Sequence, residues 1–368
     1  MNMQLRPDSG AEFYLRARVP EHPVLFFCPD ALRRVHARFV AGFPGLVTYA
    51  VKANPGPEVL RVLVGAGMRA FDVASLAEIA AVQAICPEAV LHYNNPVRSR
   101  KEIAGAVAAG VRSFSVDRVG ELDKLVALCP TGSEVSVRFK LPVAGAAYDF
   151  GAKFGARPEQ AVELMQRAAR AGFTVSLSFH PGTQCADPKP WVSYIAAAAQ
   201  IAAEAGVAPA RLNVGGGMPS HRGGLAPELD PFFKAISGAV AEAFVQPPAL
   251  LCEPGRGMVA DSMALALRVK ARDGHVLFLN DGRYGTLTEF ADIGAVERVW
   301  VPGRSGDPVP FTVFGPTCDS LDMLPAPLML PGNLDEGDYL VFEGMGAYSS
   351  VLATPFNGYG TVETVVLG

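Results

Sequence analysis

The sequence predicts an α/β protein: a closed barrel of parallel strands and helices, followed by a mostly antiparallel β-sheet or β-barrel domain. Two observations lead to this prediction. Short β-prone runs alternate with helical stretches from about residue 47 to residue 255. After about residue 260, the β-prone runs are separated by glycine, proline and aspartate instead of helices. Eight parallel strands that alternate with helices are enough to close a (β/α)8, TIM-like barrel, so we expect that architecture.

Eight β-prone runs make up the first part of the chain. They cover residues 47–51, 70–74, 90–94, 113–117, 135–139, 175–180, 211–215 and 249–255. The stretches between them carry apolar residues at helical spacing, and several end in glycine or Ala-Gly, a common helix stop. An open doubly wound sheet is the alternative, but no G-x-G-x-x-G sequence follows an early strand.

The second part reads as a separate sheet. Its β-prone runs are MALALRVKARDG, HVLFLNDG, RVWVP, FTVFGP, DYLVFEG and TVETVVLG. Residues 24–28 (VLFFC) precede the first barrel helix and are expected to join this sheet. We therefore predict a barrel domain over residues 29–258 and a β-sheet domain formed by residues 1–28 and 259–368.

Composition narrows the class of protein. Half of the 368 residues are apolar and 18% are charged, as in a globular protein with a sizeable core. A net charge of -4 without a Lys/Arg cluster argues against nucleic-acid binding. The sequence has no long apolar run and no signal-peptide pattern, so we expect no membrane role. Six scattered cysteines without a C-x-x-C pair indicate reduced thiols, a cytoplasmic location and no zinc site.

Charged and flexible residues gather at the ends of the predicted barrel strands, where functional groups of such barrels lie. They are Lys52, Asp72, Arg138, His180, the glycines of NVGGG (213–217), Glu253 and Arg256. Each of them alone has an ordinary structural explanation, such as a surface lysine or a flexible turn. Their coincidence at separate strand ends predicts one shared site.

This set suits a phosphorylated aldehyde cofactor. A lysine such as Lys52 in a partly desolvated pocket can form a Schiff base with pyridoxal 5'-phosphate. Glycine turns let backbone N–H groups approach phosphate oxygens, and Arg256 can add charge-assisted contacts. Glu253 would keep the pyridine nitrogen protonated, so that the ring draws electrons from the reacting carbon. His180 would lie flat against the ring.

Motifs along nearly the whole chain resemble one enzyme family. They are YAVKANP, FDVASLAEI, SFHPGTQ, NVGGGMP, CEPGRGM, GPTCDSLD and EGMGAYSSVLATPFNG, in the family's order. The chain resembles the fold-type III, alanine racemase-like PLP-dependent decarboxylases, especially the short bacterial ornithine/lysine decarboxylases. The resemblance implies decarboxylation of ornithine or lysine to putrescine or cadaverine, a reaction of polyamine biosynthesis.

The resemblance also implies roles for individual residues. Lys52 carries the cofactor, and the cofactor-binding residues are Lys52, Asp72, Arg138, His180, Thr183, Gly215, Gly216, Gly217, Glu253, Gly255, Arg256 and Tyr348. Pro181 and Thr183 stand where the family usually has valine and serine. Because threonine keeps the hydroxyl that a phosphate needs, we expect little change.

The GPTCDSLD motif (residues 315–322) is the most informative for the reaction. In the family it is offered to the active site of the neighbouring subunit, which makes the homodimer obligatory. The resemblance makes Cys318 the proton donor to the α-carbon after CO₂ leaves, and Asp319 the partner of a distal ammonium. It further implies an intersubunit salt bridge between Lys153 and Asp322.

Substrate choice depends on the segment NDGRYGTLTEF (280–290) and its neighbours. Diaminopimelate decarboxylases carry R-P-x-L-Y there to bind a second carboxylate, and this chain lacks it, although Arg283 is nearby. A basic substrate fits better. We expect Asp292 or Glu289 to bind its distal amine and Tyr284 to contact the substrate as well. One methylene separates lysine from ornithine, worth only about 1–3 kcal/mol of discrimination, so dual specificity is possible.

Other functions stay open from the sequence. Diaminopimelate decarboxylase, arginine decarboxylase and alanine racemase share the fold, but racemases use a tyrosine where this chain has the C-D-S motif. A non-catalytic regulatory paralogue typically loses cofactor residues, and here Lys52, Glu253 and Cys318 are all present. A single-domain PLP carrier would lack the second, β-rich part.

Overall fold

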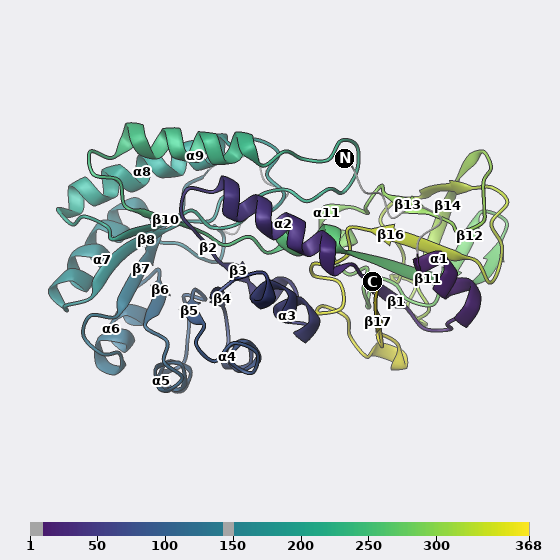
Figure 1. Ribbon diagram of the computed structural model, residues 1–368, viewed down its shortest axis with the longest axis horizontal. Helices are drawn as coiled ribbons and strands as arrows, with labels where there is room; N and C mark the ends of the chain where they lie inside the picture. Colours follow the sequence, from purple (N-terminus) through teal and green to yellow (C-terminus); the bar gives the residue numbers. More distant parts are fainter. Residues whose placement is uncertain (1–9, 143–150, 368) are drawn as a thin grey trace. The chain divides into compact units, whose positions relative to one another are not determined.

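The computed structural model describes residues 10–142 and 151–367 (Figure 1). The chain folds into two compact units. The barrel unit comprises residues 35–219 and 228–257, and the sheet unit comprises residues 1–34, 220–227 and 258–368. Parts of the predicted domains, namely residues 1–9, 143–150 and 368, lie outside the described residues.

All neighbouring strands of the barrel unit pair in parallel. The strands are β2 (Leu46–Val47), β3 (Tyr49–Ala50), β4 (Ala70–Val73), β5 (Val90–Tyr93), β6 (Ser113–Val116), β7 (Glu134–Arg138), β8 (Thr174–Ser178), β9 (Arg211–Asn213) and β10 (Ala249–Cys252). The sheet order runs from β2 through β10 and back down to β3. Only Thr48 separates β2 from β3, so the two ends of the order are halves of one strand and the sheet closes. The predicted eight-stranded barrel is confirmed.

Helices follow the strands and cover the barrel (Figure 1). They are α3 (Pro57–Gly65), α4 (Leu76–Gln83), α5 (Arg100–Ala108), α6 (Val119–Leu128), α7 (Pro158–Arg170), α8 (Lys189–Ala205) and α9 (Asp230–Ala243), and α2 (Pro29–Gly42) precedes β2. Helix α5 begins with a capping box in which Ser99 and Glu102 exchange hydrogen bonds. Helix α8 is followed by Gly206, which adopts the left-handed conformation that glycine allows. Among the helices of the described ranges, none has the length and apolarity to span a membrane.

The parallel sheet of the barrel unit buries several polar side chains. Ser115, Ser136 and Ser176 occupy matching register positions on β6, β7 and β8, and all three are buried. On β5, Nδ1 of His92 lies 2.9 Å from the hydroxyl oxygen of Ser113. Burial lowers the pKa of His92 to about 4, so this imidazole is neutral at pH 7. These buried polar side chains add to the branched apolar side chains that usually fill such a barrel.

The sheet unit contains a mixed sheet. Its strands are β1 (Val24–Phe27), β11 (Met263–Asp273), β12 (Val276–Leu279), β13 (Val299–Trp300), β14 (Pro308–Phe314), β15 (Leu328–Pro331), β16 (Tyr339–Glu343) and β17 (Glu363–Val366). Most pairs are antiparallel, whereas β1–β17 and β12–β14 are parallel. As expected, residues 24–27 join this sheet, because β1 pairs with both β11 and β17. Strand β15 was not among the predicted runs.

A small apolar core closes one side of this sheet. Helix α1 (Gly10–Arg18) buries Ala11 and Leu15 against Val24 and Phe26 of β1. The ring of Tyr14 meets that of Phe26 edge to face, with the centroids 5.6 Å apart. The remaining short elements of the chain are the 3₁₀ helices η1 (Val51–Ala53), η2 (Ala260–Ser262) and η3 (Phe356–Gly358) and the helices α10 (Arg256–Val259) and α11 (Phe290–Ile293).

The buried His92 predicts an acid-sensitive stability. Because its folded pKa is depressed below the unfolded value, its contribution is complete above about pH 6.5 and is lost as the pH falls towards 4. At pH 4 the loss approaches about 3 kcal/mol, because each tenfold change in an ionisation constant corresponds to about 1.4 kcal/mol. Denaturant unfolding at pH 7 and pH 5 should show a smaller acid loss for His92→Gln than for wild type. His275→Gln, at an exposed histidine, is the matched control and should leave the acid loss unchanged.

Candidate active site

The predicted functional residues of the barrel unit lie at the C-terminal ends of its strands. Lys52 is in η1 directly after β3, Asp72 is in β4, and Arg138 ends β7. His180 follows β8, the glycines 215–217 follow β9, and Glu253 follows β10. Because parallel strands of a barrel end on one rim, these side chains share one face of the unit.

Lys52 is paired with a buried carboxylate. Its Nζ lies 4.0 Å from Oδ2 of Asp72, and the lysine side chain keeps 48% of its exposure. Asp72 is only 3% exposed, and burial, reinforced by the charge of Glu253, raises the pKa of Asp72 well above its usual value. The Lys52 charge and a hydrogen bond from Asn94 oppose that rise. The amine is thus anchored and accessible to a ligand.

Glu253 is held by two amides that the sequence analysis did not single out. Its Oε1 accepts a hydrogen bond of 2.5 Å from Nδ2 of Asn94 and another from Nδ2 of Asn213. The Oδ1 atom of Asn213 in turn accepts the N–H of Gly215 at 2.9 Å. The carboxylate therefore has a defined orientation, as a partner of a cofactor ring nitrogen requires.

The glycine turn leaves no room for side chains. A Cβ on Gly215, Gly216 or Gly217 would lie 2.5, 2.6 or 2.4 Å from the carbonyl oxygens of Phe179, Glu253 and Gly182, respectively. Gly215 and Gly217 also have positive φ values of 69° and 93°. Without side chains, the backbone of such a turn can approach a ligand closely, as the backbone of phosphate-binding turns does.

His180 is neutral in this environment. Burial, together with the charges of Arg138 and Lys52, lowers the pKa of His180 well below its usual value. Its Nδ1 accepts the N–H of Gly182 at 3.1 Å, which makes Nδ1 the unprotonated nitrogen. A neutral imidazole held in this way suits stacking on a cofactor ring better than proton transfer.

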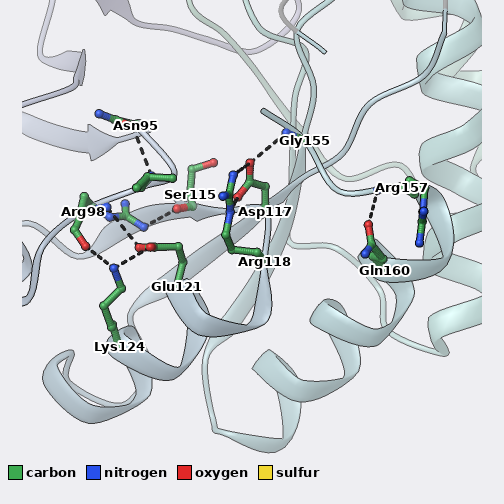
Figure 2. A network of polar contacts seen from close by, with 11 residues as sticks. Asn95, Arg98, Ser115, Asp117, Arg118, Glu121, Lys124, Gly155, Arg157 and Gln160 are labelled. Atoms are coloured by element: carbon green, nitrogen blue, oxygen red, sulfur yellow. Dashed lines mark hydrogen bonds and ion pairs between the residues drawn. The ribbon is translucent and has the colours of Figure 1, made fainter. Parts of the chain in front are cut away.

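Arg138 is supported from a neighbouring loop. Its guanidinium carbon lies 5.4 Å from the ring centroid of Phe154, in the range of cation–π contacts. Asp117, directly after β6, accepts the N–H of Gly155 at 3.0 Å and a hydrogen bond from Arg118 Nε at 2.7 Å (Figure 2). This anchor positions Phe154 next to Arg138. Asp117 ends the predicted run 113–117, and this position at a strand end was a signal for a functional residue that we did not use.

A second anchor lies beside it (Figure 2). Arg98 is buried and donates from Nη1 to the Tyr93 carbonyl at 2.9 Å and from Nη2 to the carbonyl of Ser115. Glu121 accepts the Arg98 backbone N–H at 3.2 Å and pairs with Lys124 at 2.6 Å. These contacts tie the segment after β5, which carries Asn94, to β6 and α6.

The sheet unit brings together another group of predicted residues. Cys318 is exposed, and its backbone N–H donates to Oδ1 of Asn357 at 3.1 Å. Oδ2 of the adjacent Asp319 accepts the Tyr284 hydroxyl at 2.5 Å. That hydrogen bond, followed by one from the N–H of Leu321, lowers the pKa of Asp319. Asp319 is thus held as a carboxylate beside an exposed thiol.

A cavity of about 470 Å³ lies at this loop. Its lining includes Cys318 and Asp319, with Lys270 and Phe278 on the strands β11 and β12. All of the lining residues belong to the sheet unit. The predicted proton donor and ammonium partner therefore face a space that a small molecule or a protein segment can enter.

Asp322 holds the shape of this loop. It is 1% exposed, and it accepts the N–H groups of Arg283 at 2.8 Å and Thr317 at 3.0 Å and the Thr317 hydroxyl at 2.8 Å. A salt bridge from a partner's Lys153 would need the loop to open, so this bridge stays a prediction. In this chain, Lys153 contacts the ring of Phe154, with Nζ 5.0 Å from the centroid.

The remaining predicted residues are spread over both units. Thr183 is buried in the barrel unit, and Gly255 and Arg256 follow Glu253 there, with Arg256 buried. In the sheet unit, Tyr348 has a positive φ of 54°, an unfavourable conformation for tyrosine that is often found at functional sites. Asp292 is exposed on α11, and Glu289 directly precedes that helix.

The barrel-unit rim fits pyridoxal phosphate. It offers an accessible amine, an oriented carboxylate, a neutral imidazole and a glycine turn that has no room for side chains. These are the groups needed for the aldehyde, the ring nitrogen, the ring face and the phosphate of this cofactor. Fold and site together define a fold-type III, alanine racemase-like enzyme that uses pyridoxal phosphate.

Comparison with known proteins specifies the family. Residues 30–260 match the family model described as "Pyridoxal-dependent decarboxylase, pyridoxal binding domain". The chain therefore belongs to the pyridoxal-dependent decarboxylases and is a PLP-dependent decarboxylase.

Relatives and solved structures agree with this assignment. The chain is 35% identical over 341 residues to the chloroplastic ornithine decarboxylase of Nicotiana glauca, covering 86% of this chain and 77% of that protein. The lysine/ornithine decarboxylase of Vibrio vulnificus, solved with cadaverine, is 29% identical with a TM-score of 0.86, covering 98% and 99% of the two chains. The arginine decarboxylase of Paramecium bursaria Chlorella virus is 26% identical with a TM-score of 0.88, covering 97% and 99%.

The glycine turn predicts a sharp steric test. Gly216→Ala places a Cβ against the Glu253 carbonyl, so PLP affinity should fall at least about tenfold, because the backbone must shift away from the phosphate. Equilibrium binding of PLP, followed by absorbance, measures this loss. Gly120→Ala near the start of α6, where nothing lies within 4 Å of the new Cβ, should bind PLP like wild type. Equal PLP affinity in the two variants would refute phosphate binding by the glycine turn.

Proposed function

We propose that this enzyme decarboxylates L-ornithine, L-lysine or both, and so forms putrescine or cadaverine. The observation that carries the proposal is the Asp319 carboxylate, held by the Tyr284 hydroxyl next to the exposed Cys318 thiol. A carboxylate with a lowered pKa attracts a distal ammonium group rather than a second carboxylate. The ornithine and lysine decarboxylases among its relatives support this substrate class.

The barrel-unit residues would hold the cofactor. When bound, pyridoxal phosphate supplies an electron sink for the α-carbon of an amino acid. Lys52 would hold its aldehyde carbon, while Glu253 would keep a proton on its ring nitrogen. The glycine turn 215–217 and Arg256 would bind its phosphate, assisted by Thr183 and Tyr348. His180 would lie against the ring, and Asp72, Arg138 and Gly255 would complete the pocket.

Cys318 would provide the proton that completes the reaction. After CO₂ has left, the α-carbon needs a proton, and a thiol placed at that atom can deliver it from Sγ. Its position on an exposed loop suits delivery to the active site of a partner subunit. We therefore propose an obligate homodimer with shared active sites, in which Cys318 and Asp319 complete the neighbour's rim and Lys153 pairs with the partner's Asp322.

Arginine is a second candidate substrate. The similarity to the viral arginine decarboxylase, with a TM-score of 0.88, is as high as that to the lysine/ornithine enzyme. A guanidinium group would also pair with Asp319, and Asp292 or Glu289 would be the second acid in either case.

A substrate comparison tests this proposal. CO₂ release from ornithine, lysine, arginine and meso-diaminopimelate should be fastest with ornithine or lysine. Asp319→Asn keeps the shape but removes the charge, so KM for the best substrate should rise about tenfold or more as the charge-assisted contact is lost. A preference for meso-diaminopimelate, or an unchanged KM, would contradict the proposed role of Asp319.

Mixing two inactive variants tests the shared active site. Lys52→Ala and Cys318→Ala homodimers should each be nearly inactive in correct turnover. After subunit exchange at equal concentrations, half of the dimers are mixed and each has one intact site, so activity should return to about a quarter of wild type. If Cys318 served its own subunit, no mixed dimer would contain an intact site and the mixture would stay inactive.

A further inference from the structure

Two carboxylates and one amide meet at the barrel rim. Asn94, directly after β5, donates from Nδ2 to Oε1 of Glu253 at 2.5 Å. The same side chain is hydrogen-bonded to Asp72. Asp72 belongs to β4 and Glu253 follows β10, so Asn94 links residues that are about 180 positions apart in the sequence.

The charges around this amide explain why a donor is needed there. Asp72 is faced by Glu253 and Glu78, whose negative charges disfavour its ionised form, and by Lys52, whose positive charge favours it. Arg138 is within reach of both Asp72 and Glu253. Two adjacent carboxylates tend to share a proton unless other groups stabilise both charges. A neutral amide with two N–H groups stabilises both without adding a charge.

We infer that Asn94 is a positioning residue, which holds the carboxyl groups of Asp72 and Glu253 in separate, fixed orientations by donating an N–H to each. Asp72 is then held beside Lys52, and Glu253 is held in the orientation in which it would meet the ring nitrogen. An aspartate at position 94 would add a third acid, and an aliphatic residue would leave the two carboxylates facing each other. Asparagine can donate to both carboxyl groups and adds no charge between them.

Asn213 completes the arrangement from the other side. It donates to the same Glu253 oxygen, and its own Oδ1 accepts the N–H of Gly215 at 2.9 Å. Through the two amides, the carboxylate of Glu253 is connected to the partner of Lys52 and to the glycine turn. The three parts of the cofactor site are thus held in a fixed relation by hydrogen bonds within the barrel unit.

This inference rests on the proposed role of Glu253, and its test separates the two. The full-length protein is studied as Asn94→Ala, as Asn94→Asp and, for comparison, as Glu253→Gln. Asn95→Ala is the matched control, because the neighbouring amide accepts the N–H of Val97 in its own turn (Figure 2). The readouts are kcat, KM, and the thermal unfolding midpoint at pH 5.5 and pH 8, with and without PLP.

The expected result has a pH signature. Loss of the donor raises the pKa of Asp72 further, and an acid with a raised folded pKa loses stability as the pH rises through that value. The deficit of Asn94→Ala relative to wild type should therefore be larger at pH 8 than at pH 5.5, by about 2–4 °C. A second substitution, Asp72→Asn, should abolish this pH difference. In the loaded enzyme, kcat should fall at least about tenfold, with KM within about threefold.

The contrary outcomes are distinct. A deficit that is equal at both pH values, or a kcat within about twofold of wild type, would show that Asn94 only fills space and would overturn the inference. If Asn94→Ala does not fold, the isosteric Asn94→Asp decides, since its deficit must also grow with pH. A fully active Glu253→Gln variant would instead refute the proposed role of Glu253. An inactive Glu253→Gln alongside a normal Asn94→Ala refutes only the inference.

Discussion

The hydrogen-bonded carboxylate of Glu253 is the interaction on which the barrel rim depends. A carboxylate partly withdrawn from water needs donors, and this one receives two amide N–H groups from different strand ends. Those amides reach Asp72 in one direction and the glycine turn in the other. The closed parallel sheet is what brings these strand ends to one edge. The position of Glu253 therefore depends on the closed sheet as well as on its hydrogen bonds.

Burial at the site also carries a cost in free energy, because it acts on ionisable side chains. Burial disfavours the charged forms of both Asp72 and His180, and Lys52 is paired with an acid whose surroundings favour its neutral form. Groups perturbed in this way are typical of active sites, where binding of the proper ligand relieves the unfavourable environment.

The sheet unit contributes a different kind of element. Its loop around Cys318 is shaped by the buried Asp322, which also explains why Gly282 and Gly315 carry no side chain: a Cβ on either would lie 2.3 or 2.2 Å from the Asp322 carboxylate. An exposed thiol beside an anchored carboxylate is suited to being presented to a second molecule. In the proposed reaction, the loop would supply the proton and the barrel would supply the cofactor pocket.

Local sequence was enough for much of this protein. The alternation of β-prone and helical runs predicts the barrel, and motifs around Lys52, the glycine turn and Glu253 predict the cofactor, because both depend on patterns within a few residues. Tertiary structure decided what depends on contacts between distant segments. The pairing of Asn94 with Glu253, the burial of Asp322, the support of Arg138 by Phe154 and the strand β15 have no local signature, since each exists only after the chain has closed on itself.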